Sequence, residues 1–303
     1  MRREPAFDYT TVGHVTVDVL ADGSRRPGGS AFYSALQAAR LGQRTLILTQ
    51  GSPGEIERLI EPYREELELR VLPSPATTTL ATSTQLPTSA HDGGEQRTQR
   101  VLAWAGQIAE VTVDTAILHL APVARETPRA WSGCADFVGI TPQGLARAWS
   151  DDEHGGARSA VDAEHREMRS AAVDRGALAD GCYALVLSEH ERTSCAEIVS
   201  AAGEAGAVVA ITAGARPTTI LTPDGREAQV AVPTIERPRE DLGAGDVFAA
   251  AFFVALAEGR PPARAAAFAT AAAAVRVSGV GADAIGDREA IEARLRATPS
   301  TPG

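Results

Sequence analysis

The segment Gly243-Ala244-Gly245-Asp246 combines a turn, a helix start and a carboxylate. Pro233 and Pro238 precede it, and the apolar run 247–257 that follows is rich in helix formers. The first N–H groups of a helix lack partners within the helix and lie at the positive end of its dipole, and glycines let the backbone approach a ligand. Such a turn suits phosphate. A carboxylate there is useful if it removes a proton from an attacking hydroxyl, so the pattern indicates phosphoryl transfer with Asp246 as general base.

A simpler interpretation is a tight turn with Asp246 as an ordinary acidic residue in the first turn of a helix, and for an isolated motif it is the preferred one. Two other phosphate-binding patterns do not fit. The dinucleotide pattern needs Gly or Ala at position 248, which is Phe248. A Walker A loop needs Lys, and the chain contains none.

The wider motif resembles the Asp-Thr-x-Gly-Ala-Gly-Asp signature of the ribokinase-like (PfkB-type) carbohydrate kinases, with Glu240 and Asp241 in place of Asp-Thr. The resemblance implies that Gly243, Ala244 and Gly245 form an anion hole and that Asp246 is the base. Because Glu240-Asp241 departs from the signature, it leaves open whether a monovalent cation binds.

Composition limits the alternatives. The chain has 303 residues with 29 basic against 39 acidic ones, a net charge of −10, which argues against nucleic-acid binding. The three cysteines show neither a zinc pattern nor the even number of a disulfide framework. The N-terminus lacks the apolar region of a signal peptide, and the Ala-rich runs 244–257 and 265–277 are too short to span a membrane. We therefore expect a cytoplasmic protein without membrane partners.

The residues around Asp18 form a second candidate site. Thr10 to Leu20 reads as a strand, and Gly28-Gly29-Ser30 opens a helix with Ser30 as N-cap and Gly42 as its stop. The resemblance implies that Asp18 binds acceptor hydroxyls and that Gly28 and Gly29 let the acceptor lie on the helix start. Taken alone, Asp18 reads as a strand-end carboxylate that caps a turn.

Tyr33 stands where the family often has an Asn that contacts the sugar. A phenol offers an apolar face and one polar tip, so we expect an acceptor with an apolar or planar part, unless Tyr33 points into the core. The alternating segments 77–85 and 96–104 predict an antiparallel hairpin, which in the family forms a lid over the sugar. The segment Arg97-Thr98-Gln99 lies on its return strand, as a substrate contact or on a solvated face.

Ser188 and Glu191 directly follow the apolar run 184–187, one of four runs that read as buried parallel strands. The other runs are 116–120, 137–140 and 207–212, and the pattern predicts strands that alternate with helices. The resemblance implies that Ser188 lies near the nucleotide phosphates and that Glu191 organises Mg²⁺ and its waters. The alternative is a helix N-cap closed by Glu191 in a capping box.

Four further residues resemble the family's nucleotide site. Thr212 and Gly214 end the run 207–212 and match a motif that binds nucleotide phosphate and ribose. Gly279 and Gly281 lie in a Gly-rich turn that flanks adenine in the family.

Together the motifs resemble the family from residue 13 to 281. The resemblance implies an α/β fold, a three-layer ribokinase-like sandwich with a mostly parallel central sheet. One kinase domain spans 1–303, with a small β lid from about 12–24 and 77–104. The implied function is ATP- and Mg²⁺-dependent phosphorylation of an alcohol on a sugar, nucleoside or cyclitol. The alternative is a non-catalytic relative that binds a nucleotide or sugar. A homodimer through the lid is left open.

Overall fold

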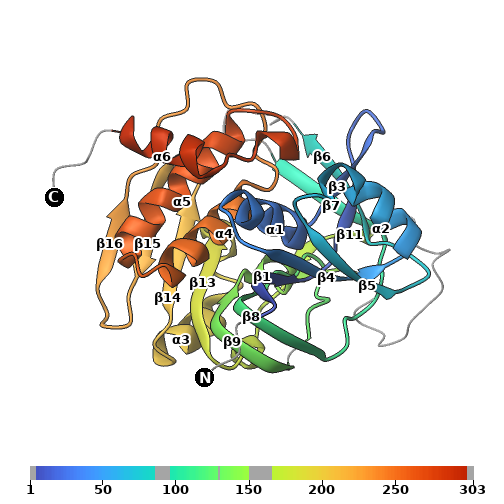
Figure 1. The fold of residues 1–303 in the computed structure, drawn as a ribbon, viewed down its shortest axis with the longest axis horizontal. Helices are drawn as coiled ribbons and strands as arrows, with labels where there is room; N and C mark the ends of the chain where they lie inside the picture. Colours follow the sequence, from blue (N-terminus) through green and yellow to red (C-terminus); the bar gives the residue numbers. More distant parts are fainter. Residues whose placement is uncertain (1–4, 86–95, 129, 150–165, 299–303) are drawn as a thin grey trace.

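A nine-stranded sheet runs through the middle of the molecule (Figure 1). The computed structural model describes residues 5–85, 96–128, 130–149 and 166–298. Every neighbouring pair from β5 through β14 is parallel, and β15 and β16 extend the sheet antiparallel. In spatial order the strands are β16 (Glu227–Val230), β15 (Arg216–Leu221), β14 (Val208–Ala213), β13 (Cys182–Ser188), β9 (Trp131–Ile140), β8 (Val111–Leu120), β1 (Phe7–Val12), β4 (Thr45–Gly51) and β5 (Glu68–Pro73).

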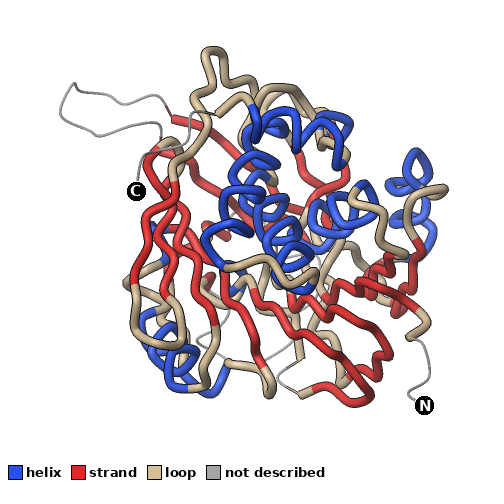
Figure 2. The backbone as a smooth tube through the Cα atoms, turned by 60° about the vertical axis from the view of Figure 1, so that its left-hand side comes forward, coloured by secondary structure: helices blue, strands red, loops and turns tan. Residues whose placement is uncertain are grey.

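Helices cover the two faces of this sheet unequally (Figure 2). Successive side chains of a strand point to opposite faces. Thus Ala184 and Val186 of β13 belong to the core formed with α1, α4 and α5, whereas Leu185 and Leu187 belong to the core formed with α3. The helices are α1 (Ser30–Arg40), α2 (Pro53–Ile60), α3 (Ala196–Glu204), α4 (Ala244–Ala257), α5 (Pro262–Val277) and α6 (Arg288–Arg296).

A second, five-stranded sheet contains the segments predicted for the lid, and we call this sheet the lid. Its order is β11 (Arg166–Glu167), β7 (Gln96–Ala103), β6 (Thr79–Gln85), β2 (Thr16–Val19) and β3 (Arg25–Gly28). The predicted hairpin is present, because β6 and β7 pair antiparallel. The sheet also contains β3 and β11, which lie outside the ranges 12–24 and 77–104 predicted for the lid.

The expected strand from Thr10 to Leu20 is instead two strands in two sheets. β1 ends at Val12 in the central sheet, and β2 begins at Thr16 in the lid. The chain changes sheet over Gly13-His14-Val15, where the N–H of Val15 donates to Thr49 Oγ1 at 2.9 Å. The break places Asp18 in the lid instead of the central sheet. A segment rich in β-forming residues does not by itself show whether it forms one bent strand or two strands.

Two further local predictions need correction. Ser30 is not the N-cap of α1: it is the first helical residue, and Gly29 with φ 92° holds the cap position without a side-chain hydrogen bond. Strands and helices do not alternate throughout. In the described residues between β8 and β13 the connections contain only the short strands β10 (Arg147–Ala148), β11 and β12 (Arg169–Ser170) and the 3-10 turns η2 (Pro142–Gly144) and η4 (Arg175–Ala177).

The C-terminal third follows the predicted pattern closely. α4 begins at Ala244, and its residues from Val247 to Leu256 are buried on all sides. Such a helix is apolar all round because both the sheet and its neighbours α1 and α5 cover it.

The remaining 3-10 turns are η1 (Glu61–Tyr63), η5 (Glu189–Glu191) and η6 (Ala282–Ala284). Within the described ranges, no helix has both the length and the apolar character needed to cross a membrane.

Candidate active site

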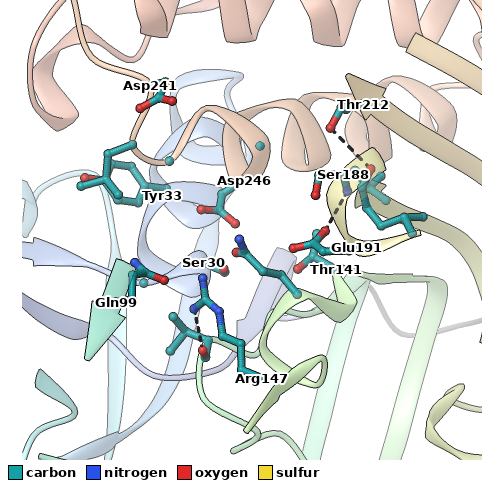
Figure 3. A pocket seen from close by; sticks show the side chains of 18 of the residues that line it. Ser30, Tyr33, Gln99, Thr141, Arg147, Ser188, Glu191, Thr212, Asp241 and Asp246 are labelled. Carbon is teal, nitrogen blue, oxygen red and sulfur yellow. Dashed lines mark hydrogen bonds between the residues drawn. The ribbon is translucent and has the colours of Figure 1, made fainter. Parts of the chain in front are cut away.

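A cavity of about 240 Å³ lies where the lid meets the carboxyl ends of the central strands (Figure 3). The carboxyl ends of parallel strands are the usual ligand-binding edge of an α/β sheet. Nine of the residues predicted from the sequence line it: Asp18, Gly29, Tyr33, Ser188, Glu191, Thr212, Gly243, Gly245 and Asp246. The chain thus brings together side chains that are up to about 230 positions apart in the sequence.

The start of α4 forms one wall of this cavity. Gly243 is the N-cap with φ 78°, a left-handed conformation that favours glycine, and Asp246 lies in the first turn. The N–H of Ala244 donates to the carbonyl of Asp241 at 3.0 Å and so closes the turn. In the described structure the N–H groups of Gly243, Gly245 and Asp246 have no acceptor. Two of the three predicted amides, those of Gly243 and Gly245, can therefore receive an anion together with that of Asp246, whereas the Ala244 amide is used in the turn.

Asp246 points into the cavity, half-buried, with Arg147 and Glu191 directed into the same space (Figure 3). Burial raises the pKa of Asp246 to about 6; Ser30 and Arg147 oppose this increase, whereas Glu191 and Asp18 add to it. A carboxylate with a pKa near 6 is ionised at neutral pH yet basic enough to accept a proton from a hydroxyl as that hydroxyl attacks. The environment therefore suits a general base.

Asp18 approaches the cavity from β2 of the lid. It is 6% exposed, and Thr16 Oγ1 donates to its Oδ1 at 2.7 Å. Burial raises its pKa to about 6. A Cβ on Gly28 would lie 2.1 Å from Asp18 Oδ2, so Gly28 makes room for the carboxylate although it does not itself line the cavity. Asp18 is thus fixed where it can accept hydrogen bonds from a polyol.

Tyr33 lines the cavity but is only 3% exposed. Its ring packs beside Phe32, with 5.3 Å between the ring centroids, and below the Arg276 guanidinium, 5.7 Å from the ring centroid. Burial raises the pKa of Tyr33, and the charge of Asp18 adds to this, so the phenol remains neutral. The two interpretations from the sequence, core residue and pocket residue, both describe part of its environment.

Ser188 and Glu191 form the capping box of η5. The N–H of Ser188 donates to Glu191 Oε2 at 2.8 Å, and the Ser188 hydroxyl receives the N–H of Glu191. Both residues nevertheless line the cavity, and Thr212 follows on the neighbouring strand β14. The helix-cap interpretation is therefore correct for the contacts of the pair, and Glu191 also lines the cavity.

Arg147 was not recognised in the sequence. It is the sole basic residue that lines the cavity among the described residues, against the four carboxylates of Asp18, Glu191, Asp241 and Asp246. Its Nη1 donates to the carbonyl of Val123 at 2.8 Å. Burial lowers the pKa of Arg147, and the surrounding carboxylates, Glu191 first, oppose that decrease. A guanidinium does not lose its proton in this range, so Arg147 supplies a fixed positive charge.

A buried carboxylate outside the cavity positions Arg147. Glu126 is 0% exposed and accepts the N–H groups of His14, Val123 and Ala124 at 2.8, 2.9 and 2.6 Å. These bonds fix the turn whose Val123 carbonyl receives Arg147. No sequence signal identified this turn, because the acceptor and its donors are separated by up to 112 residues and belong to no motif.

Other cavity residues were also missed: Ser30, Leu80, Val123, Thr141, Gln143, Val186, Leu187, Asp241 and Leu242. Gln99, from the return-strand segment that was weighed as a substrate contact, does line the cavity. Gln99 lies two residues after Arg97 on β7; the Arg97 side chain lies outside the described residues. Ala244, Gly214, Gly279 and Gly281 do not line the cavity. Gly281 instead donates its N–H to Glu240 Oε2 at 2.6 Å, and the carbonyl of Gly279 accepts from Arg276 at 3.5 Å.

The carboxylates of the cavity fit a hydrated Mg²⁺. In the part of the chain that the structure describes, no three His, Cys, Asp or Glu residues form a metal-binding group. Mg²⁺, however, keeps several waters and is usually held by one or two carboxylates together with substrate phosphates, so a complete protein cage is not needed. Glu191, which lines the cavity, offers such a carboxylate.

Comparisons with known proteins agree with this geometry. Residues 182–288 match the model of the pfkB family of carbohydrate kinases. No curated protein matches the sequence. A sulfate-complexed pyrophosphate-dependent kinase of the ribokinase family is similar over 94% of this chain and 99% of its own, with a TM-score of 0.69 and 20% identity.

Two further solved structures are similar. Ribokinase from Arabidopsis thaliana, complexed with ribose and ATP, has a TM-score of 0.64 at 18% identity and covers 96% of this chain and 99% of its own. A nucleoside kinase from Methanocaldococcus jannaschii has a TM-score of 0.63 at 15% identity and covers 95% and 98%. The predicted α/β ribokinase-like fold is confirmed, as is the resemblance to PfkB-type carbohydrate kinases.

Proposed function

We propose that this chain, which has the ribokinase fold and whose residues 182–288 match the PfkB carbohydrate kinases, transfers a phosphoryl group to an alcohol of a small sugar, nucleoside or cyclitol. The observation that carries the proposal is the environment of Asp246. Its carboxylate lies in the first turn of α4, beside three N–H groups without acceptors and with a pKa of about 6. A base and an anion site within one helical turn are what transfer to a hydroxyl requires.

The remaining residues have complementary roles. Asp18 accepts hydrogen bonds from acceptor hydroxyls and holds the reacting one near Asp246. The amides of Gly245 and Asp246, together with the Arg147 guanidinium, stabilise charge that develops on the transferred group. Glu191 would hold Mg²⁺ through its waters, and the chemistry which that ion supplies is neutralisation of phosphate charge. Asp246 takes the proton of the attacking hydroxyl.

ATP is the proposed donor, in line with the ribokinase structure that contains it. One observation favours inorganic pyrophosphate as a second candidate. The cavity of about 240 Å³ reaches Ser188, Glu191 and Thr212 but not the turn 279–281 predicted to flank adenine. Similar solved structures include a pyrophosphate-dependent kinase complexed with a pyrophosphate analogue and myo-inositol. A cytoplasmic location and a homodimer through the lid stay predictions.

A panel of donors and acceptors tests the proposal. The purified chain is incubated with Mg²⁺, with ATP or pyrophosphate, and with ribose, other sugars, nucleosides or inositols, and products are identified by phosphorus NMR. A phosphomonoester that forms only when donor and acceptor are both present supports the proposal. Binding of nucleotide or sugar without any phosphomonoester over the whole panel supports a non-catalytic binding protein instead.

A further inference from the structure

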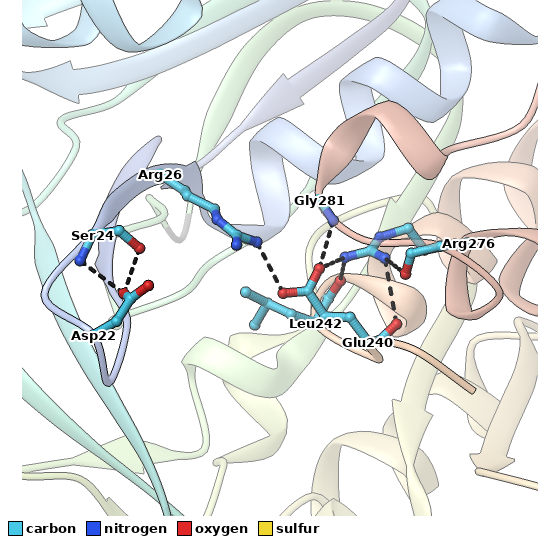
Figure 4. A network of polar contacts seen from close by, with 8 residues as sticks. Asp22, Ser24, Arg26, Glu240, Leu242, Arg276 and Gly281 are labelled. Atoms are coloured by element: carbon cyan, nitrogen blue, oxygen red, sulfur yellow. Dashed lines mark hydrogen bonds and ion pairs between the residues drawn. The ribbon is translucent and has the colours of Figure 1, made fainter. Parts of the chain in front are cut away.

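Behind the anion-binding turn lies a fully buried guanidinium, that of Arg276 near the end of α5 (Figure 4). Its side chain is 0% exposed. Nη2 donates to the carbonyl of Leu242 at 2.6 Å and to Glu240 Oε2 at 3.0 Å, and Nη1 donates to the carbonyls of Glu240 at 3.3 Å and Gly279 at 3.5 Å. One cation thus gathers three backbone carbonyls and a carboxylate from two loops.

The Glu240 carboxylate extends this network to the lid. Besides Arg276 it accepts the N–H of Gly281 at 2.6 Å and Arg26 Nη1 at 3.1 Å. Burial acts to raise the pKa of Glu240, but the Gly281 amide and Arg276 outweigh it and the pKa is lowered. Arg26 lies on β3, directly opposite Asp18 on β2. Glu240 therefore connects the strand pair that carries Asp18 with the loop that leads into Gly243.

We propose that Arg276 and Glu240 are positioning residues for the phosphoryl transfer proposed above: they hold the loop 240–243 in the shape that directs the Gly245 and Asp246 amides into the cavity. Carbonyl oxygens that converge in a buried space repel one another unless a cation lies between them. The Arg276 guanidinium is that cation, and because it is covalently fixed the loop needs no dissolved monovalent ion. Arg26, through Glu240, holds the lid in register with the loop.

The proposal has a specific chemical consequence. Arg276→Ala removes the cation and leaves a space lined by the carbonyls of Glu240, Leu242 and Gly279 and by the Glu240 carboxylate. Those oxygens are suited to bind guanidinium or K⁺ from solution. We expect kcat of Arg276→Ala to fall about 10²-fold, the size of effect produced by a misplacement of about 1 Å in an active site. Guanidinium chloride below denaturing concentrations, or KCl, should restore part of that loss.

Arg276→Lys and the lid variants complete the set. Arg276→Lys keeps the charge but not the fork of donors, so its kcat should fall less than that of Arg276→Ala. Arg26→Ala breaks only the lid contact and should raise the KM for the acceptor several-fold with kcat little changed. Arg25→Ala is the matched control, because Arg25 is the neighbouring residue on β3 and its ion pair with Glu55, at 2.8 Å, does not involve the loop.

The assay uses the full chain with its best donor and acceptor, in K⁺, Na⁺ or tetramethylammonium chloride at equal ionic strength. The wild-type rate should be equal in all three salts, and Arg276→Ala should be slow in tetramethylammonium and faster with guanidinium or K⁺. Two results contradict the proposal: a wild-type rate that depends on K⁺, or an Arg276→Ala variant that unfolds cooperatively and whose kcat is unchanged or unaffected by both cations. A failure of the proposed kinase function differs from both, because the wild type would then transfer no phosphate in any salt.

Discussion

The ring of Tyr33 lies against the α-carbon of Gly243, so closely that a Cβ on Gly243 would come within 2.5 Å of the ring carbons. The contact joins α1 to the turn that precedes α4, two elements that line the same cavity. Together with the φ of 78° at Gly243, it explains why glycine precedes the helix at this point.

Gly243→Ala should therefore impair catalysis more than folding. The left-handed conformation costs a non-glycine residue about 1 kcal/mol, and the new methyl group must push either the ring or the turn aside. Gly259→Ala is the control: Gly259 has φ 83° but nothing within 4 Å of a Cβ. Gly259→Ala should lose only the stability that the left-handed conformation costs, whereas Gly243→Ala should lose more because of the displaced ring, and only Gly243→Ala should lose kcat. Equal kcat values in the two variants would mean that the Tyr33 contact does not shape the turn.

Tyr33→Asn tests the choice of acceptor. Tyr33 lines the cavity, and a phenol offers an apolar face and one polar tip. The wild type should therefore prefer an acceptor with an apolar or planar part, such as a nucleoside or the C–H face of a cyclitol, over free ribose. Because the substitution also removes support from Gly243, the ratio of kcat/KM for ribose to that for the best acceptor is the informative quantity. That ratio should rise in the variant. A wild type that prefers ribose, or an unchanged ratio, would show that Tyr33 acts only in the core.

Glu191→Gln should raise the Mg²⁺ concentration needed for half-maximal rate more than it changes the KM for the acceptor. The amide oxygen of Gln keeps the hydrogen bond from the Ser188 N–H, but the charge that attracts the hydrated ion is lost. Glu189→Gln is the matched control, since Glu189 lies in the same turn but pairs with Arg216 at the surface. If Mg²⁺ titrations of the two variants coincide with that of the wild type, Glu191 has only its capping role.

Arg147→Met should lower kcat by about 10²-fold, as the loss of one preorganised charge-stabilising group does in other active sites. It should also move the acidic limb of the pH–rate profile to higher pH, because Arg147 lowers the pKa of Asp246. Arg169→Met is the control, since Arg169 is exposed on the adjacent strand β12. A profile of Arg147→Met with the wild-type limb would contradict the role of this guanidinium beside Asp246.

The cavity residues that the sequence predicted are mostly those whose positions depend on local backbone shape. Gly243 to Asp246 lie at a helix start, and Ser188 with Glu191 follows a strand end, where a few adjacent residue types determine the geometry. Asp18 instead lies within β2, and the family resemblance rather than local shape predicted it. Arg147 and Glu126 were not predictable in this way. Arg147 is placed by a carbonyl 24 positions away, and Glu126 by a backbone N–H 112 positions away. Such pairings arise from tertiary packing and leave no pattern in a single sequence.

Glu240 is another residue whose partner could not be predicted from the sequence. Because Glu240 departs from the family signature, the sequence raised the question of whether a monovalent cation binds there. The partner of Glu240, Arg276, lies 36 positions later in the chain, in an apolar Ala-rich helix. From the sequence alone, an Arg in such a helix is interpreted as a charged residue at the end of the helix. The structure shows instead that its guanidinium contacts the loop.

The pKa of Asp246 defines both the expected pH–rate profile and a control for stability. Because the folded protein raises this pKa from 3.8 to about 6, the folded state binds the proton more tightly than the unfolded one. The ionised carboxylate therefore lowers the free energy of unfolding. The stability that the protonated carboxyl contributes at low pH is lost as the pH rises through about 6. Asn does not ionise, so Asp246→Asn should unfold at pH 8 at a temperature no lower than the wild type.

The most direct test is the pH dependence of kcat/KM for the wild type and Asp246→Asn on the best donor and acceptor. The wild-type rate should rise with pH to a plateau above about 6, and the variant should be slower by about 10²–10⁴-fold on that plateau, because a positioned general base is lost. Donor binding, measured by calorimetry, should persist. A folded Asp246→Asn variant with kcat/KM within a few-fold of the wild type and the same acidic limb would contradict the assignment of Asp246 as the base.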